Sequence, residues 1–292
     1  MAITAAMVKE LREKTGAGMM DCKKALTATD GDAAKAIDWL REKGIAKAEK
    51  KAGRVAAEGA VGAFVAADGK TGCVVEINCE TDFAAGNDQF KELLAKVAEH
   101  IVATKPADMD ALNDSEIEGK KVSTLITEAT ATIGEKISLR RFACYETDGI
   151  VAAYSHAGGK IVTMVEMKGG DAALAKDIAM QVAAANPAYL DRSQVPTAEL
   201  EHEKQILTEQ ARNEGKPDNI IEKMVVGRIE KYYKEVCLVD QAFIKSDDGE
   251  AISKLLKKAN AEVVRFVRFE MGEGLEKKNE DFAAEVAAQI KG

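Results

Sequence analysis

The sequence feature that most constrains this chain is an internal repeat of a strand–turn–strand pattern. Residues 60–77 hold two apolar runs on either side of Asp68-Gly69-Lys70, and residues 150–167 hold two on either side of Gly158-Gly159-Lys160. Apolar runs of this length joined by a glycine turn are typical of a β-hairpin. The two hairpins align without a gap, so we expect one structural unit to occur twice.

A helical stretch and a third strand follow each hairpin. The helices are expected over residues 90–102 and 174–185, and the third strands over residues 137–142 and 264–269. Hairpins combined with helices in this way predict an α+β fold. Its core would be duplicated and built from small antiparallel sheets with helices.

The two copies differ in length at two places. The first copy has five extra residues between its hairpin and its helix, and the second has a long insert before its third strand. The insert contains helical stretches over residues 200–212 and 220–236, with Gly215 and Pro217 between them. Glycine ends helices and proline suits a first helical turn, so the insert predicts a projecting helical hairpin. The apolar stripe of its second helix consists of Ile221, Met224, Val225, Ile229 and Tyr232.

The N-terminal region predicts a bundle of three short helices. Thr4 is placed to cap the first helix, and Gly16 interrupts it. A second helix is expected over residues 19–28, and a third is expected to be capped by Asp30 and to end at Gly44. The apolar face of the third helix would consist of Ala33, Ile37 and Leu40. So small a bundle has a small core, and such units commonly dock on other proteins.

These patterns divide the chain into six segments. They are a helical docking bundle (1–54), the first half of the core (55–147), the first part of its second half (148–190), the inserted helical hairpin (191–236), the last part of the second half (237–270) and a C-terminal module (271–292). The last segment predicts a helix with Phe282, Val286 and Ile290 on one face. That face would pack on the chain's own core or on a partner, and the sequence leaves both open.

Charge and hydropathy disfavour two classes of partner. The 292-residue chain has a net charge of −8, whereas proteins that track phosphate backbones are usually basic. We therefore expect no direct nucleic-acid binding. No apolar run approaches the length of a membrane span, and the first residues lack the layout of a secretory signal. A cytoplasmic protein without membrane contact is the resulting expectation.

The sequence contains little that would support catalysis or a cofactor. The five cysteines form no CxxC pair, and their odd number fits a reducing compartment, so no metal site is expected. Gly69-Lys70-Thr71 is similar to the end of a phosphate-binding loop, but Phe64 stands where that loop needs a glycine. No nucleophile motif is present, and the three histidines leave little for acid–base chemistry. We expect a protein that is not an enzyme.

The five-residue excess in the first copy is the strongest candidate for a functional loop. Residues 78–88 stand where the second copy has only residues 168–173. A loop that one copy has and its sister lacks favours a functional interpretation. The structural alternative is that Phe83 packs into its own core while Asp82 caps the next helix. Two further hypotheses remain: an enzyme with Asp82 or Glu76 as general base, and a helical docking adaptor.

Two long motifs resemble the elongation factor Ts family. Residues 11–26 are similar to its N-terminal signature, and residues 76–83 are similar to its second signature. Residues 215–217, 222–225 and 268–274 also resemble that family, so the similarity spans nearly the whole chain in the expected order. The family often has valine and a basic or amide residue where this chain has Ala84 and Gly86.

The resemblance implies a fold and a function. The family fold is an N-terminal bundle similar to ubiquitin-associated domains, a two-part α+β core, an inserted helical hairpin and a C-terminal module. Elongation factor Ts binds elongation factor Tu and speeds the release of its GDP, acting as a guanine nucleotide exchange factor. No cofactor of its own is implied, because GDP, GTP and Mg²⁺ belong to the partner. A homodimer through the hairpin or the core stays open.

The resemblance also implies which residues contact the partner. In the second signature, Phe83 would be a wedge that enters the partner's nucleotide domain, Asp82 would orient it and Thr81 would support the loop. The other implied contacts are Arg12, Met19 and Met20 toward the nucleotide domain, His156 toward another domain, and Phe282 and Val286 in a docking helix. For Met19 and Met20 the alternative is a place in the small core of the bundle, and for His156 it is a solvent-exposed side chain without a role.

Overall fold

The computed structural model describes residues 3–276, which form two compact units. The first unit contains the described residues up to Gly62, Val75–Phe142, and the described residues from Glu270 on. The second contains Ala63–Val74 and Ala143–Phe269. Helices and small sheets occur in both, so the predicted α+β class is confirmed.

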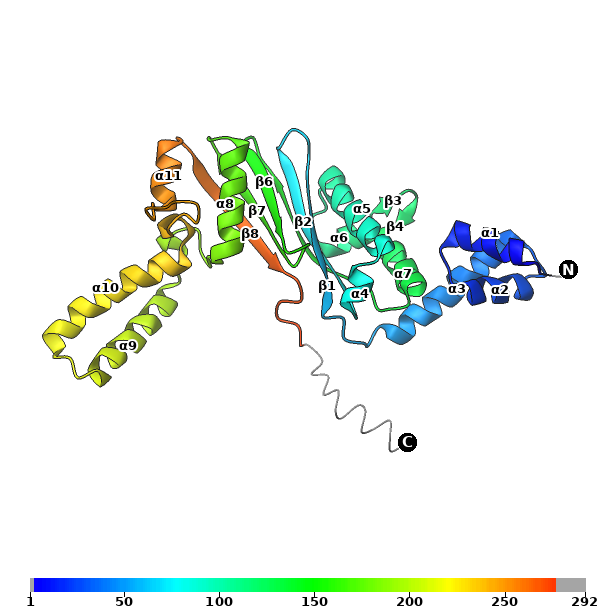
Figure 1. Cartoon of the computed structure of the whole chain (residues 1–292), viewed down its shortest axis with the longest axis horizontal. Helices are drawn as coiled ribbons and strands as arrows, with labels where there is room; N and C mark the ends of the chain where they lie inside the picture. Colours follow the sequence, from blue (N-terminus) through cyan, green and yellow to red (C-terminus); the bar gives the residue numbers. More distant parts are fainter. Residues whose placement is uncertain (1–2, 277–292) are drawn as a thin grey trace, which may run out of the picture. The chain divides into compact units, whose positions relative to one another are not determined.

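The N-terminal bundle consists of α1 (Ala5–Thr15), α2 (Met19–Ala28) and α3 (Ala33–Lys51). Thr4 caps α1 as predicted, because its hydroxyl accepts a hydrogen bond from the Met7 N–H at 3.3 Å. Gly16 ends α1 at φ 66°, a left-handed conformation that suits glycine. The three helices pack on one another as a small bundle at the N-terminal end of the first unit (Figure 1).

Both predicted ends of α3 are wrong. The cap is Asp32, whose Oδ1 accepts a hydrogen bond from the Lys35 N–H at 3.1 Å, while Asp30 lies in the preceding turn with φ 51°. At the other end α3 continues through Gly44 to Lys51. A Cβ at Gly44 would lie 2.9 Å from the Cβ of Ala131 on another helix, so this glycine permits close helix packing and does not end α3.

The inward face of α3 is also shifted from the prediction. Ala36 is fully buried and packs with Trp39 and Leu40, whereas Ile37 is 40% exposed. The spacing of the buried set follows the three- and four-residue period of a helix, starting from Ala36 and not from Ala33. The buried residues of the bundle core are Val8, Leu11, Cys22, Ala25, Leu26 and Ala36.

The first copy of the repeat forms a three-stranded sheet. Its strands are β1 (Glu58–Val65), β2 (Thr71–Cys79) and β5 (Ser138–Glu146), in the order β1-β2-β5. The central strand β2 is buried along its whole length. At the predicted turn Gly69 has φ 67°, and Asp68 accepts a hydrogen bond from the Lys70 N–H, so Gly69-Lys70 belongs to a hairpin turn and not to a phosphate loop.

Helices connect β2 to β5. A short helix, α4 (Asp82–Ala85), precedes α5 (Asp88–Thr104), which is the helix predicted for this copy. The chain then forms α6 (Met109–Asp114), the small hairpin of β3 (Glu116–Ile117) and β4 (Lys120–Lys121), and α7 (Val122–Ile133). The last helix packs on α3 and α5 and was not predicted from the sequence.

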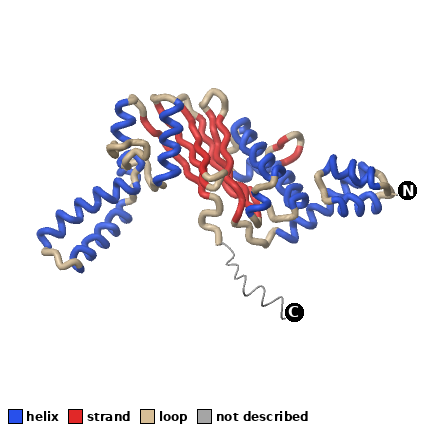
Figure 2. Tube along the Cα trace, viewed as in Figure 1, coloured by secondary structure: helices blue, strands red, loops and turns tan. Residues whose placement is uncertain are grey.

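The second copy repeats this arrangement. The strands β6 (Ile150–His156), β7 (Ile161–Lys168) and β8 (Glu262–Glu270) form a sheet in the order β6-β7-β8. β6 and β7 are antiparallel, with Ile150 opposite Met167 and His156 opposite Ile161. The predicted helix is α8 (Ala172–Ala185), which lies along this sheet (Figure 2).

The core of this copy lies between α8, α11 (Ile252–Lys258) and the sheet. Its fully or nearly fully buried side chains are Val165, Met167, Ala175, Ile178, Ala179, Val182, Leu238, Ile252, Leu256 and Val263. α11 directly precedes β8, as α7 directly precedes β5, so each copy has a further helix before its third strand. The duplication therefore includes one more element than the sequence pattern indicated.

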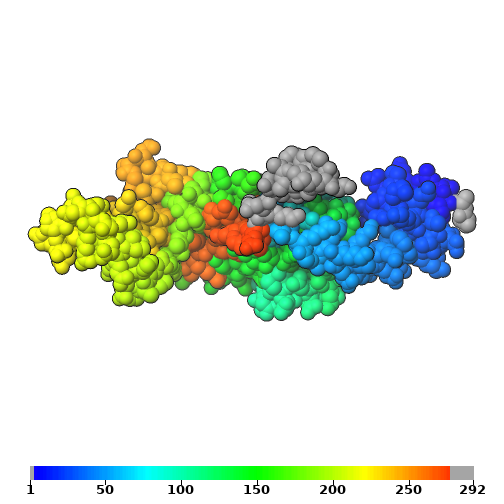
Figure 3. Space-filling view, turned by 90° about the horizontal axis from the view of Figure 1, so that it is seen from below, coloured from blue at the N-terminus to red at the C-terminus, as the bar shows by residue number. Residues whose placement is uncertain are grey.

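The insert of the second copy is a helical hairpin, as predicted. α9 (Thr197–Asn213) and α10 (Asp218–Val236) lie side by side and extend away from α8 (Figure 1), and they form the yellow and yellow-green part of the surface in Figure 3. Gly215 has φ 71° and Pro217 precedes α10. Ile221 and Ile229 of the predicted stripe are buried against α9, and short 3-10 turns at Arg192–Gln194 and Leu238–Asp240 flank the hairpin.

Two sequence predictions are not tested by the described residues. The C-terminal helix with Phe282, Val286 and Ile290 lies outside the described residues. The six domain boundaries stay predictions. Among residues 3–276, no helix combines the length and the apolar character needed to cross a membrane.

Candidate functional site

The five-residue excess of the first copy forms α4 and its flanks, which we call the Phe83 loop (residues 80–86). Thr81 caps α4, since its hydroxyl accepts a hydrogen bond from the Ala84 N–H at 3.2 Å. The following helix α5 has its own cap in Asn87, whose Oδ1 accepts a hydrogen bond from the Gln89 N–H at 2.8 Å. The alternative in which Asp82 caps that helix is therefore wrong.

Phe83 points into solvent. Its side chain is 88% exposed, the highest value among the exposed large apolar side chains of the described residues. The neighbouring Ala84 is only 6% exposed and provides the inward contact of the loop. The alternative in which Phe83 packs into its own core is thus wrong. A phenylalanine kept in water by an ordered loop loses the free energy that its burial would gain, which favours a binding role.

The loop is anchored by one carboxylate from a distant part of the chain. Glu135, between α7 and β5, accepts three hydrogen bonds from the loop. Oε2 accepts the Glu80 N–H at 3.1 Å and the Thr81 N–H at 2.9 Å, and Oε1 accepts the Thr81 hydroxyl at 2.7 Å. This carboxylate therefore fixes the backbone from which α4 begins.

The side chain of Glu80 in turn binds the segment that contains Glu135. Its Oε1 accepts a hydrogen bond from the Lys136 N–H at 2.7 Å. Its Oε2 also pairs with Arg54 at 3.2 Å. Glu135 thus binds the backbone of Glu80 and Thr81, and Glu80 binds the backbone of Lys136, the residue that follows Glu135, so hydrogen bonds in both directions join the two segments.

Glu76 is arranged as a structural residue and not as a general base. Its fully buried carboxylate accepts hydrogen bonds from Arg140 at 2.9 Å, Arg141 at 2.6 Å, Asn78 at 3.1 Å and the Gly272 N–H at 2.8 Å. Burial raises the pKa of the Glu76 carboxyl, but the hydrogen bonds from Gly272, Arg140, Arg141 and Asn78 outweigh it and the pKa is lowered. A carboxylate whose acceptor sites are used in this way is poorly suited to take a proton from a substrate.

The predicted contacts on the bundle lie at its surface. Met19 is 55% exposed and Met20 is 64% exposed, and Arg12 is exposed on α1. The bundle core is filled by other residues, so the alternative in which both methionines belong to that core is wrong. Exposed methionines adapt to irregular surfaces and are common at binding sites.

His156 lies at the exposed end of β6, next to the turn that leads to β7. Its Nδ1 lies 3.4 Å from the hydroxyl of Tyr154, which is its neighbour on the same face of the strand. His156 belongs to the second unit, whereas the Phe83 loop and the exposed residues of the bundle belong to the first. Phe282 and Val286 lie outside the described residues.

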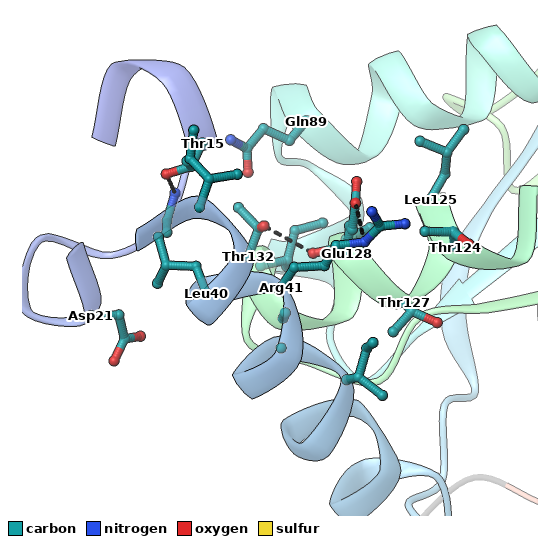
Figure 4. Close-up of a pocket in the computed structure, with 18 of the residues that line it drawn as sticks. Thr15, Asp21, Leu40, Arg41, Gln89, Thr124, Leu125, Thr127, Glu128 and Thr132 are labelled. Atoms are coloured by element: carbon teal, nitrogen blue, oxygen red, sulfur yellow. Dashed lines mark hydrogen bonds and ion pairs between the residues drawn. The ribbon is translucent and has the colours of Figure 1, made fainter. Parts of the chain in front are cut away.

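A pocket of about 830 Å³ lies elsewhere, between the bundle and helices α5 and α7. Figure 4 shows Arg41 of α3 facing Glu128 of α7, with 3.8 Å between their charged groups. The exposed Ile37 and Ile45 also line it. None of the predicted partner-binding residues within 3–276 lines this pocket.

Other chemical features of the described residues do not form a reactive centre. Between residues 3 and 276, no three His, Cys, Asp or Glu side chains are placed to hold a metal ion. Burial raises the pKa of the Cys73 thiol to about 12 and that of Cys79 to about 12, so both thiols stay protonated and unreactive at neutral pH. All five cysteines are free of disulfides.

Sequence reasoning proposed Thr81, Asp82 and Phe83 as site residues but gave no indication of Glu135 or of the contact between Glu80 and Lys136. Glu135 lies 54 residues after Thr81, and only the glycine before it marks the place as the end of a helix. No local pattern identifies a carboxylate that binds a distant backbone. The signal exists only in the folded chain.

The sequence was compared with models of known families. The model of the family described as elongation factor TS matches residues 80–273, which is more than half of the chain. The matched segment contains the Phe83 loop, both third strands and the helical hairpin.

Proposed function

Because this chain belongs to the elongation factor Ts family, whose members serve translation elongation, we propose that it binds elongation factor Tu and promotes release of GDP. The chain acts by binding its partner and not by catalysing a reaction. It holds no cofactor of its own, since GDP, GTP and Mg²⁺ belong to elongation factor Tu. Its place of action is the cytoplasm, where translation takes place.

The observation that carries this proposal is the exposed Phe83 on an anchored loop that the sister copy lacks. The side chain is 88% exposed, and Thr81 and Glu135 hold the backbone behind it. Such a side chain serves as a wedge that enters the nucleotide domain of the partner. Asp82 begins the same helical turn and orients the wedge, and Thr81 supports it.

The free energy gained by burying Phe83 in the partner limits how far this side chain can weaken GDP binding. Burying a phenylalanine side chain contributes roughly 1.5–3 kcal/mol. If this energy is realised only in a partner conformation with a distorted phosphate and magnesium site, it weakens GDP binding by the same amount. Since ~1.4 kcal/mol corresponds to a factor of ten in affinity, Phe83 alone supplies about one to two decades. Any larger loss of GDP affinity must come from further contacts between the two proteins.

Those further contacts are proposed from the exposed residues already described and from the C-terminal module that the resemblance implies. Arg12, Met19 and Met20 bind the nucleotide domain, and His156 binds a second domain of the partner. Phe282 and Val286 complete the interface from the C-terminal module. Each of these residues is a candidate for substitution in a binding assay.

Loss of a fluorescent GDP from elongation factor Tu, followed by stopped flow, tests the proposal. We expect the full-length protein to accelerate this loss in a concentration-dependent and saturable way. By linkage, excess GDP should in turn weaken the complex of the two proteins. The protein alone should show no binding of fluorescent GDP.

An adaptor without exchange activity would bind elongation factor Tu and leave the rate of GDP loss unchanged. Binding measured by calorimetry together with an unchanged rate would therefore contradict the exchange function and favour the adaptor. Absence of binding would contradict both.

A further inference from the structure

The Phe83 loop depends on a group that no sequence motif indicates. Of the hydrogen bonds that hold residues 80 and 81 to the rest of the unit, three end on the carboxylate of Glu135. They include both successive backbone N–H groups and the hydroxyl of the cap residue. Thr81 is thereby fixed at its backbone and at its side chain together.

The segment that contains Glu135, residues 134–136, also contacts the end of α3 and the residues after it. Lys136 donates from Nζ to the carbonyl of Arg54 at 2.9 Å, and Lys51 donates to the carbonyl of Gly134. Residues 134–136 therefore contact both the segment after α3 and the start of the Phe83 loop. Glu135 lies at the centre of this junction and is half-buried.

We propose that Glu135 is a positioning residue for nucleotide exchange, which rests on the proposed function of the Phe83 loop. Its carboxylate orients the N-terminus of α4, and α4 in turn holds Phe83 away from the core. An aromatic side chain on an ordered loop binds without the entropy loss of ordering that loop, so the carboxylate preorganises the wedge. Glu135 acts through Thr81 and Phe83 and needs no contact with the partner.

The chemistry of the three hydrogen bonds defines a graded set of variants. Glu135→Ala removes all three acceptors. Glu135→Gln keeps an oxygen that can accept both N–H groups, and its amide can donate to the Thr81 hydroxyl, so it retains the geometry without the charge. Glu99→Ala, at an exposed position of α5, is the matched control for loss of a glutamate side chain.

Stopped-flow release of fluorescent GDP from elongation factor Tu is the first measurement. Glu135→Ala should lower the maximal release rate about tenfold, and it should change the concentration for half-maximal rate less, because the other proposed contacts remain. Glu135→Gln should recover most of the rate, and Glu99→Ala should match the unmodified protein. Equal rates for Glu135→Ala and Glu99→Ala would overturn the proposal.

A double-mutant cycle with Phe83→Ala separates positioning from a general structural effect. If Glu135 acts through Phe83, then adding Glu135→Ala to Phe83→Ala should slow release no further. A full additional loss in the Phe83→Ala background would show that Glu135 acts by another route and would overturn the proposal.

Amide hydrogen exchange of the protein without partner provides a readout independent of the exchange function. The amides of Glu80 and Thr81 should be protected, should exchange faster in Glu135→Ala and should regain protection in Glu135→Gln. Unchanged protection in Glu135→Ala would contradict the positioning role. An unmodified protein that fails to stimulate GDP release from elongation factor Tu would instead contradict the proposed function, so the two failures are distinguishable.

Discussion

At the scale of single residues, two side chains in the same copy have opposite environments. Phe83 is 88% exposed, whereas Phe90, at the start of α5, is fully buried. Phe83→Ala should therefore reduce the free energy of unfolding by well under ~1 kcal/mol, as surface substitutions usually do. Phe90→Ala should reduce it by about 3–5 kcal/mol.

Denaturant unfolding of both variants, together with their rates of stimulated GDP release, checks this pair. We expect Phe83→Ala to unfold like the unmodified protein and to stimulate GDP release from elongation factor Tu markedly less. A large loss of stability with an unchanged release rate would show that Phe83 is structural.

Glu76 provides a prediction about pH. Burial raises the pKa of this carboxyl, but its four hydrogen-bond donors outweigh burial and lower the pKa from the ordinary 4.5. A lowered pKa in the folded state means that the interaction stabilises the protein above the unfolded pKa and is lost as the pH falls through the folded value. Glu76→Gln should cost at least ~2 kcal/mol at neutral pH, because Arg140 and Arg141 lose a charged acceptor.

The measurement is the free energy of unfolding of both proteins between neutral pH and pH values below 4.5. The difference between them should shrink as the pH falls. A difference that stays constant across this range would mean that the ionised carboxylate is not the stabilising form.

At the scale of helices, two glycines within helices have different reasons to be there. Gly44 lies in α3 where a Cβ would approach Ala131 to 2.9 Å, whereas at Gly227 in α10 no described side chain or other segment comes within 4 Å of such a Cβ. Gly227→Ala should stabilise the protein by up to ~1 kcal/mol, because alanine favours a helix. Gly44→Ala should not stabilise the protein, because the added methyl group forces α3 away from α7 and the lost packing offsets the gain in helix propensity.

Thermal unfolding of the two single variants checks this prediction. The double variant Gly44→Ala with Ala131→Gly should recover part of the loss, because the close approach is then restored with the methyl group on the other helix. Equal stabilisation by both single variants would show that the approach of α3 to α7 is not tight.

The base of the helical hairpin should loosen at alkaline pH. Tyr189 and Tyr232 both donate their hydroxyl hydrogen to Glu199, at 2.5 Å each. The hydrogen bond to Glu199 raises the pKa of Tyr189, and burial followed by the same hydrogen bond raises that of Tyr232. Because the folded state raises these pKa values, the protonated hydroxyl groups stabilise the hairpin at pH values below the unfolded pKa of about 10. Their stabilisation is lost as the pH rises through the folded pKa.

Hydrogen exchange or limited proteolysis of α9 against pH measures this loosening. The variant Tyr189→Phe with Tyr232→Phe should be more open at neutral pH and should respond less to a rise in pH. An identical pH response in both proteins would contradict the role of the two hydroxyl groups.

The elements that were predicted and those that were missed differ in how local their signals are. The hairpins, α5, α8 and the inserted hairpin follow from glycine turns, apolar runs and periodic stripes within each segment. α7 contains several threonines and other β-branched residues with weak helix propensity, so its helix depends on packing against α3 and α5. The cap of α3 was misplaced because Asp30 and Asp32 lie in one turn, and only the fold decides which carboxylate reaches the helix.

The candidate site shows the same division. Phe83 could be found because the two copies of the repeat differ there in length, which is visible in the sequence alone. Its exposure, and the anchoring by Glu135, depend on how residues far apart in the chain meet in the fold. A comparison of internal repeats therefore locates such a loop but not the groups that hold it.

At the scale of the whole molecule, the second copy of the core shows how the same hairpin joins its helix when the Phe83 loop is absent. The second copy passes from β7 to α8 through Gly169, Gly170 and Asp171, and Asp171 caps α8 by accepting a hydrogen bond from the Leu174 N–H. This short connector is the chain's own example of how such a hairpin joins its helix without a Phe83 loop. Replacing residues 80–87 by Gly-Gly-Asp should give a folded protein that no longer stimulates GDP release.

Circular dichroism and thermal unfolding would check that the chimera folds, and stopped flow would measure its activity. A chimera that still drives exchange would place the activity outside the loop. If it folds and is inactive, the scaffold shared by the two copies is sufficient for folding, and residues 80–87 are needed only for exchange. The short connector of the second copy would then do for folding all that the long one does, and the added residues would serve the partner alone.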